Sequence, residues 1–103
     1  MKVIYKEPGK EAEVRNIDND LETLQSLVCG YIEHLTFITG VGMIMNEEGK
    51  LHNMEPNFIY GWDMVVGPAI FVGESGEDFR DISDDEAMRV LEFLRWHDNR
   101  RSK

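Results

Sequence analysis

Apolar residues recur along the chain at two spacings: every second position, which is typical of strands, and every third or fourth, which is typical of helices. Residues 1–17 follow the first spacing, with Val3 and Tyr5 before a Glu-Pro-Gly-Lys sequence and Val14 after it. A Pro-Gly pair between alternating segments is typical of a turn. This stretch therefore predicts a β-hairpin.

Helical spacing occurs twice. Residues 19–29 carry a leucine and valine stripe, with Asn19 as the expected N-cap and Gly30 as the expected stop. Residues 83–98 start with Ser83 and Glu86 at the positions of a capping box. The side chains expected to face the sheet from this second helix are Ala87, Val90, Leu91 and Leu94.

The middle of the chain returns to strand spacing. Residues 31–38 and 41–51 predict an antiparallel pair, with Gly40 and Gly42 in its turn. The stretch at residues 55–63 leads into a buried strand at 63–74, and residues 74–79 predict a tight turn. Because proline cannot donate to a strand ladder, Pro68 predicts that the strand at 63–74 is an edge strand or has a bulge at the Gly67-Pro68 step.

Together these elements predict an α+β fold in the order β-β-α-β-β-β-α. Its mostly antiparallel sheet has about five strands, and both helices pack on it. The length of 103 residues and 42% hydrophobic content fit one domain over residues 1–103. Residues 98–103 are expected to be a frayed tail.

Charge changes the picture of possible partners. The formal net charge is −9, and residues 31–79 hold eight acids against one base, Lys50. This excess disfavours direct nucleic-acid binding and most anionic membrane surfaces. One cysteine, no apolar leader and no apolar run long enough to span a bilayer indicate a cytoplasmic protein without a membrane segment.

Catalytic and metal-binding signatures are weak. Cys29 and His34 lack a third orienting residue, so Cys29 is interpreted as a small core residue. The three histidines do not have metal-ligand spacing, and the calcium-loop-like Asp-Ile-Ser-Asp-Asp-Glu has glutamate where that loop needs glycine. The sequence therefore predicts no catalytic residues, no metal site and no cofactor.

The stretch Glu-Pro-Asn-Phe-Ile-Tyr-Gly-Trp-Asp, residues 55–63, is the strongest candidate for a binding surface. Alternation would place Phe58, Tyr60 and Trp62 on one face, as core, as a dimer interface or as a stacking platform for a planar ligand. Gly61 suggests close approach of backbone or ligand. The residues predicted to bind a ligand are Tyr31, Glu33, Asn57, Tyr60, Trp62 and Asp63.

Most of the chain resembles a family of small bacteriophage and mobile-element proteins, domain of unknown function 3846. The most specific matches are the Glu-Pro-Gly-Lys hairpin, the Gly-Tyr-Ile-Glu strand start and the Asn-Glu-Glu-Gly-Lys-Leu turn. The family usually has a basic residue after the asparagine that corresponds to Asn57, where this chain has Phe58. The resemblance implies a mobile-element accessory protein and supplies no catalytic residues.

Three functions follow as expectations. The first is a non-enzymatic, homo-oligomeric accessory protein that sequesters a small nucleotide-like ligand, with counter-defence inside a bacterial host as its expected setting. The second is an acidic inhibitor that binds a basic host protein. The third is an enzyme whose signature the sequence does not reveal.

Overall fold

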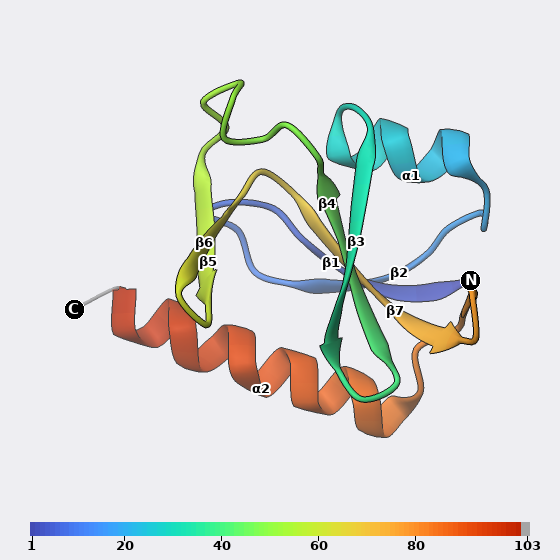
Figure 1. The fold of residues 1–103 in the computed structure, drawn as a ribbon. Helices are drawn as coiled ribbons and strands as arrows, with labels where there is room; N and C mark the ends of the chain where they lie inside the picture. The colour runs from blue at the N-terminus through green and yellow to red at the C-terminus, as the bar shows by residue number, and fades with distance from the viewer. Residues whose placement is uncertain (102–103) are drawn as a thin grey trace.

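A six-stranded antiparallel sheet forms the centre of the molecule, and a separate two-stranded hairpin packs beside it (Figure 1). The computed structural model describes the backbone of residues 1–101 and the side chains of residues 1–98. The elements in chain order are β1 (Lys2–Lys6), β2 (Glu13–Asn16), α1 (Leu21–Val28), β3 (Ile32–Ile38), β4 (Val41–Asn46), β5 (Pro56–Tyr60), β6 (Asp63–Val66), β7 (Ala69–Ser75), β8 (Asp78–Arg80) and α2 (Asp84–Arg101).

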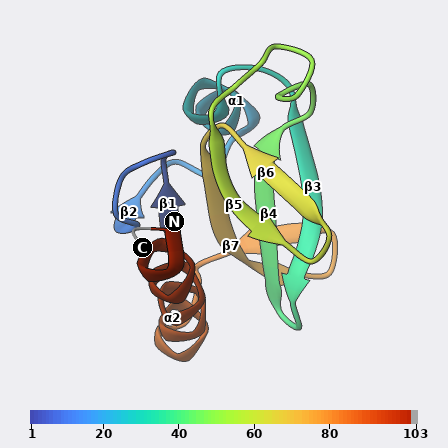
Figure 2. The ribbon, with the colours of Figure 1, turned by 90° about the vertical axis from the view of Figure 1, so that its left-hand side faces the viewer.

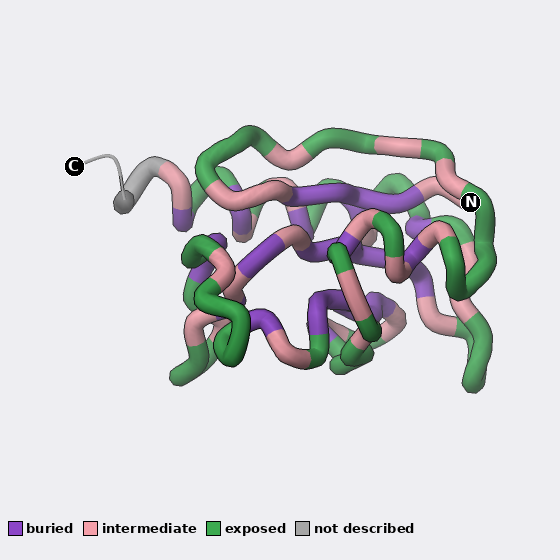
Figure 3. Tube along the Cα trace, turned by 90° about the horizontal axis from the view of Figure 1, so that it is seen from above, coloured by how far each residue is buried: buried purple, intermediate pink, exposed green. Residues whose placement is uncertain are grey.

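The strands of the main sheet follow the order β2-β1-β7-β4-β3, and β8 pairs with β7. Phe71 on β7 lies opposite both Ile4 on β1 and Met43 on β4, so these three side chains share one face. Their neighbours Tyr5, Ile70 and Ile44 share the other face. Figure 3 shows the buried stretches along the central strands and the exposed ones at the periphery. The predicted α+β fold is confirmed.

Helix α1 covers the second of these faces through Leu24 and Val28. Its N-cap is Asp20, whose carboxylate accepts a 2.7 Å hydrogen bond from the amide of Thr23, so the prediction of Asn19 was wrong by one residue. Cys29 ends the helix in the left-handed conformation with φ 67°. This turn directs its side chain to solvent, which corrects the prediction of a buried cysteine.

Helix α2 covers the first face, together with the β5–β6 hairpin (Figure 2). The predicted capping box is confirmed, because the amide of Ser83 donates to Glu86 at 2.9 Å and the amide of Glu86 donates to the Ser83 hydroxyl at 3.2 Å. Ala87, Val90 and Leu94 are buried against the sheet, whereas Leu91 is half-buried at its margin.

The end of α2 differs from its predicted end. The helix continues through Arg101, four residues into the segment predicted to be a frayed tail. Residues 102 and 103 of that predicted tail lie outside the described residues. In the described part of the chain, no helix combines the length and hydropathy needed to cross a membrane.

The stretch predicted as one buried strand at 63–74 is divided between two sheets. β6 pairs with β5, and β7 lies between β1 and β4 in the main sheet. The break falls at Gly67, whose φ of +75° turns the chain before Pro68. The proline therefore sits in a crossover. Of the two predicted alternatives, the edge strand is wrong because β7 is central. The irregularity does fall at the predicted Gly67-Pro68 step, but as a change of sheet and not as a bulge within one strand.

The predicted β3–β4 pair is confirmed, but only Gly40, with φ +84°, belongs to its turn. Gly42 lies within β4 instead. A Cβ there would come within 2.6 Å of the His34 ring and 2.9 Å of the Glu74 carboxylate, which themselves form a 2.6 Å contact. This close approach of two side chains is the physical reason for glycine at that position.

Candidate functional site

A pocket of about 430 Å³ opens between the β3–β4 face and the β5–β6 hairpin. Its floor is apolar, its rim is charged, and the loop after β4 closes one side. The lining residues are Glu33, Leu35, Met43, Met45, Asn46, Glu47, Glu48, Gly49, Lys50, Leu51, Tyr60, Asp63, Met64, Val65 and Val66. A volume of this size is within the range of small-molecule sites.

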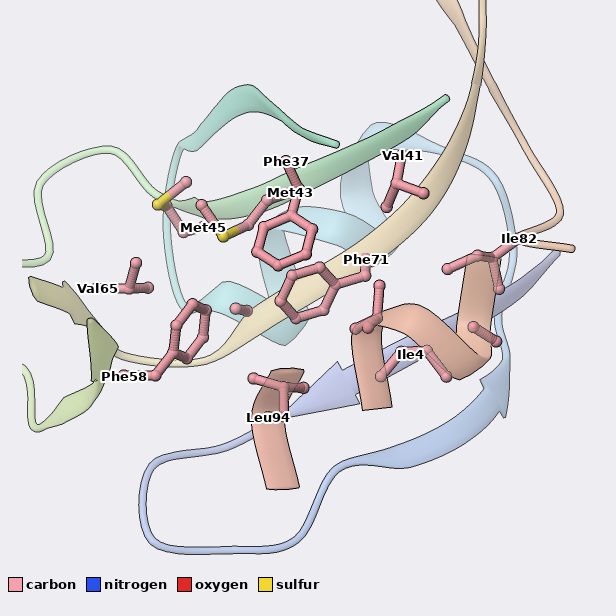
Figure 4. Packing of buried hydrophobic residues seen from close by; sticks show 13 residues of the cluster. Ile4, Phe37, Val41, Met43, Met45, Phe58, Val65, Phe71, Ile82 and Leu94 are labelled. Atoms are coloured by element: carbon pink, nitrogen blue, oxygen red, sulfur yellow. The ribbon is translucent and has the colours of Figure 1, made fainter. Parts of the chain in front are cut away.

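Strand register builds the floor. Glu33 lies opposite Met45, and Leu35 lies opposite Met43, so all four point to the same face of the sheet. Val65 on β6 completes the apolar wall from the hairpin, and Figure 4 shows it with Met45 at one end of the core. Leu35 is 46% exposed although it lines the pocket. The pocket is therefore open toward β3.

Asn46 holds the loop that closes the pocket. Its side-chain amide donates to the carbonyls of Val28 at 3.1 Å and Cys29 at 3.2 Å, and its side-chain oxygen accepts from the amide of Glu48 at 2.7 Å. One buried side chain thus ties the end of α1 to the loop. Gly49 lets this loop approach β6, since a Cβ there would lie 2.9 Å from Val66.

The rim is mainly anionic. Its carboxylates come from Glu33, Glu47, Glu48 and Asp63, and its single ammonium comes from Lys50. Lys50 is paired with Asp63, and its hydrogen bond holds the pKa of that carboxyl below the ordinary value. Asp63 is therefore ionised at neutral pH, and Lys50 is already engaged by an anion. The pocket favours an uncharged or cationic ligand.

The structure brings together three of the six predicted ligand-binding residues, namely Glu33, Tyr60 and Asp63. The other three, Tyr31, Asn57 and Trp62, are not among the lining residues. Tyr31 is exposed just before β3, where its carbonyl accepts from the amide of Glu47 at 2.8 Å. That contact sets the loop position and leaves the phenol outside the pocket.

The three aromatics of residues 58–62 do not share a face. Phe58 is fully buried in the core with Phe71 and Phe93, and Tyr60 is half-buried, with its hydroxyl donating to the carbonyl of Phe37. Trp62 is fully exposed. The predicted alternation fails because β5 ends at Tyr60 and Trp62 belongs to the turn into β6.

Gly61 is explained by that turn. It has φ +64° and is the first of two residues between the paired Tyr60 and Asp63, the position that a type II′ hairpin gives to glycine. A Cβ at Gly61 would meet no atom within 4 Å. No backbone approaches this glycine closely, so that part of the prediction is wrong, and the turn itself accounts for the glycine.

Asn57 has a structural role instead of the predicted binding role. It is fully buried, and its amide donates to the carbonyl of Lys6 at 2.9 Å and of Gly67 at 2.8 Å. These bonds join β5 to the end of β1 and to the crossover before β7. A side chain enclosed in this way does not reach the pocket.

Most residues of the pocket wall were not predicted from the sequence. Leu35, Met43, Met45 and Leu51 lie in segments that alternation marks only as strand or turn, so no local motif identifies them. Leu35 and Leu51 reach the pocket only through contacts between segments that are far apart in the sequence. The one local indication of the site was the concentration of acids around Lys50, and the charged rim of the pocket accounts for it.

A second cavity of about 360 Å³ lies beside α2 and is lined by Glu11, Ala12, Leu91, Leu94, Arg95 and Asp98. It shares no residue with the first pocket and has a more polar lining. Among the described residues, no three His, Cys, Asp or Glu side chains are grouped so that they could hold a metal ion.

Comparison with curated proteins and with solved structures gives no match. A family model, in contrast, matches residues 1–95, which is most of the chain. That range includes both helix-capping motifs, the whole pocket and the strands β1 to β8. The match confirms the resemblance found in the sequence, and the chain belongs to the family described as Domain of unknown function (DUF3846).

Proposed function

We propose that this protein acts by binding, and that its pocket takes an apolar group carried by a ligand without net negative charge. The observation that carries the proposal is one pocket with an apolar floor of Leu35, Met43 and Met45 and a rim of four carboxylates against one paired lysine. Apolar walls with few polar groups are the usual composition of a ligand site.

The charge decides between the expected functions. A nucleotide phosphate in this pocket would face Glu33, Glu47 and Glu48, while Lys50 is held by Asp63. Anion sites instead use arginine, lysine or free backbone amides. The geometry therefore favours the acidic binding protein over sequestration of a phosphorylated signal. An accessory, counter-defence role of a phage or mobile element in a bacterial cytoplasm is the setting that we propose for this binding.

Self-association is not part of the proposal. Phe58, Trp62 and the apolar run from Met64 to Val72 were the residues that predicted an oligomer. Of these, Phe58, Val65 and the β7 residues from Ala69 to Val72 are buried within the single chain. Trp62 is the exposed exception, and one side chain does not make an interface.

A pair of ligands with similar alkyl chains and opposite headgroup charges tests the proposal. We expect calorimetry to show that octylammonium binds about tenfold or more tightly than octanoate, a difference of about 1.4 kcal/mol, because the rim attracts the ammonium. Salt should weaken this preference by screening. Equal affinity for the two ligands, or tighter binding of nucleotides than of octylammonium, would contradict the proposal.

Protein variants locate the site. Leu35→Arg places a long charged side chain at the mouth of the pocket and should abolish octylammonium binding. Leu21→Arg is the matched control, because Leu21 is also an exposed leucine but lies on α1, on the opposite face of the sheet. Loss of binding in both variants would point away from this pocket.

A further inference from the structure

The open side of the pocket is the free edge of a strand. β3 is the last strand of the main sheet and pairs only with β4 in the described part of the chain. Figure 2 shows its other edge facing away from the body of the molecule. An unpaired strand edge carries backbone donors and acceptors that a further strand can use.

The hydrogen-bond pattern between β3 and β4 identifies which backbone groups of β3 point away from β4. The amide of Glu47 donates to the carbonyl of Tyr31, so Tyr31 and Glu47 form a hydrogen-bonded pair. Bonded pairs alternate along an antiparallel ladder, so Glu33 and Leu35 also direct their backbone groups toward β4. Residues Ile32, His34 and Thr36 therefore direct their N–H and C=O groups outward.

The side chains of β3 alternate between the two faces of the sheet. Glu33 and Leu35, whose backbone groups are used by β4, line the pocket and are exposed. A strand added at this edge would lie about 4.8 Å from β3, with every second side chain on the pocket face. A side chain opposite Leu35 would meet apolar walls, and one opposite Glu33 would meet a carboxylate.

We infer that β3 and the pocket together bind an extended segment of a partner polypeptide that carries lysine or arginine beside an apolar side chain. The backbone of the segment pairs with Ile32, His34 and Thr36, its apolar side chain enters the pocket, and its cations meet Glu33 and the other rim carboxylates. Strand addition with side-chain pockets is an established mode of peptide recognition. This inference rests on the proposed function and specifies the ligand class.

Charge argues against a second copy of this chain as the occupant. Each copy has a formal net charge of −9, and each pocket would present its acidic rim to the other. A basic segment of another protein removes this repulsion and gains attraction at every rim carboxylate. Exposed Leu51, which also lines the pocket, adds apolar surface for such a segment.

The probe is the pentapeptide acetyl-Arg-Thr-Leu-Thr-Arg-amide, which places its leucine and arginines on one face of a strand. Calorimetry should show saturable one-to-one binding to the wild-type protein. The charge-reversed peptide with glutamate in place of arginine should bind at least about tenfold more weakly, because the rim repels it. Leu35→Arg should abolish binding, and Leu21→Arg should retain it.

Backbone pairing has its own control. Methylating the two threonine amides removes the donors to β3 and keeps every side chain, so we expect at least about tenfold weaker binding. Equal binding of the methylated peptide would overturn strand addition and leave the proposed function standing. Binding of octylammonium without binding of the peptide would overturn the inference of a polypeptide partner and leave the proposed function standing.

Two further outcomes would also overturn the inference. If neither octylammonium nor the peptide binds, the proposed function fails together with it. If light scattering shows a dimer that the peptide dissociates, the occupant of the β3 edge is a second copy of the chain.

Discussion

At the residue scale, Asn57 and Trp62 were both predicted to bind a ligand, and the structure places them in different surroundings, neither of them in the pocket. Asn57 is buried, and its side-chain amide donates to two backbone carbonyls, whereas Trp62 is fully exposed in a turn. Polar side chains that are buried must be satisfied internally, so Asn57 serves the fold. Trp62 contributes surface, and the stability of the fold does not depend on it.

Asn57→Ala should therefore destabilise the protein. It leaves the carbonyls of Lys6 and Gly67 without their buried donor, at a cost of about 1–3 kcal/mol for each. Chemical denaturation monitored by circular dichroism measures this loss. Asn16→Ala, on the exposed strand β2, is the control and should stay within about 0.5 kcal/mol of the wild type. Equal stability of both variants would refute the role assigned to Asn57.

Two adjacent residues of the β5–β6 turn are expected to differ in how much their substitution changes the free energy of unfolding. Gly61→Ala should cost about 1 kcal/mol or more, because alanine is strained at φ +64° even though space is open around it. Trp62→Ala should leave the free energy of unfolding within about 0.5 kcal/mol of the wild type, since no burial is lost. A larger loss for Trp62→Ala than for Gly61→Ala would show that the indole packs on the fold.

At the element scale, α2 shows how far periodicity can predict burial. The capping box and the buried residues Ala87, Val90 and Leu94 were predicted correctly. Leu91 is only half-buried because it borders the second cavity. Leu94→Ala should cost about 2–5 kcal/mol as a fully buried large-to-small change. Leu91→Ala should cost less. Thermal unfolding of both variants tests this ranking of the stability losses. A larger loss for Leu91→Ala than for Leu94→Ala would mean that the helix turns a different face to the sheet.

The cap of α2 predicts a pH dependence. Hydrogen bonding from Arg80, together with the amide of Ser83, lowers the pKa of Glu86 from an ordinary 4.5 to about 2. Because the pKa is lower in the folded state, this stabilisation is complete above pH 4.5 and is lost as the pH falls toward about 2.

Glu86→Gln keeps an acceptor for the amide of Ser83 but cannot titrate. The free energy of unfolding of this variant should therefore fall less steeply with acidification across the same window. Arg80→Met should reduce the slope similarly, because it removes the principal cause of the shift. Slopes identical to the wild type in both variants would contradict the assignment.

Local patterns predicted the elements better than their assembly. Alternation located β3 and β4, and the helical stripes located α1 and α2, because each needs only neighbours in sequence. The division of residues 63–74 between β6 and β7 depends on Gly67 turning the chain out of one sheet and into another. The pocket depends on that division, so only Glu33, Tyr60 and Asp63 of its wall were identified.

At the scale of the whole molecule, the crossover at Gly67 creates the site. It lets β5 and β6 stand apart from the main sheet while β7 enters its centre, which leaves an apolar space above Met43 and Met45. Four of the eight acids of residues 31–79 lie at the mouth of this space. An apolar floor and an anionic rim are complementary to a cationic ligand with an apolar group.

The most direct test of this account is an amide chemical-shift map of the isotope-labelled protein titrated with octylammonium. We expect the largest changes on the strands that enclose the pocket, at Leu35, Met45 and Val66, and none at Leu24 on α1, across the sheet. Changes centred on the second cavity at Leu91 and Arg95, or no changes at all, would contradict the claim that this pocket is the binding site.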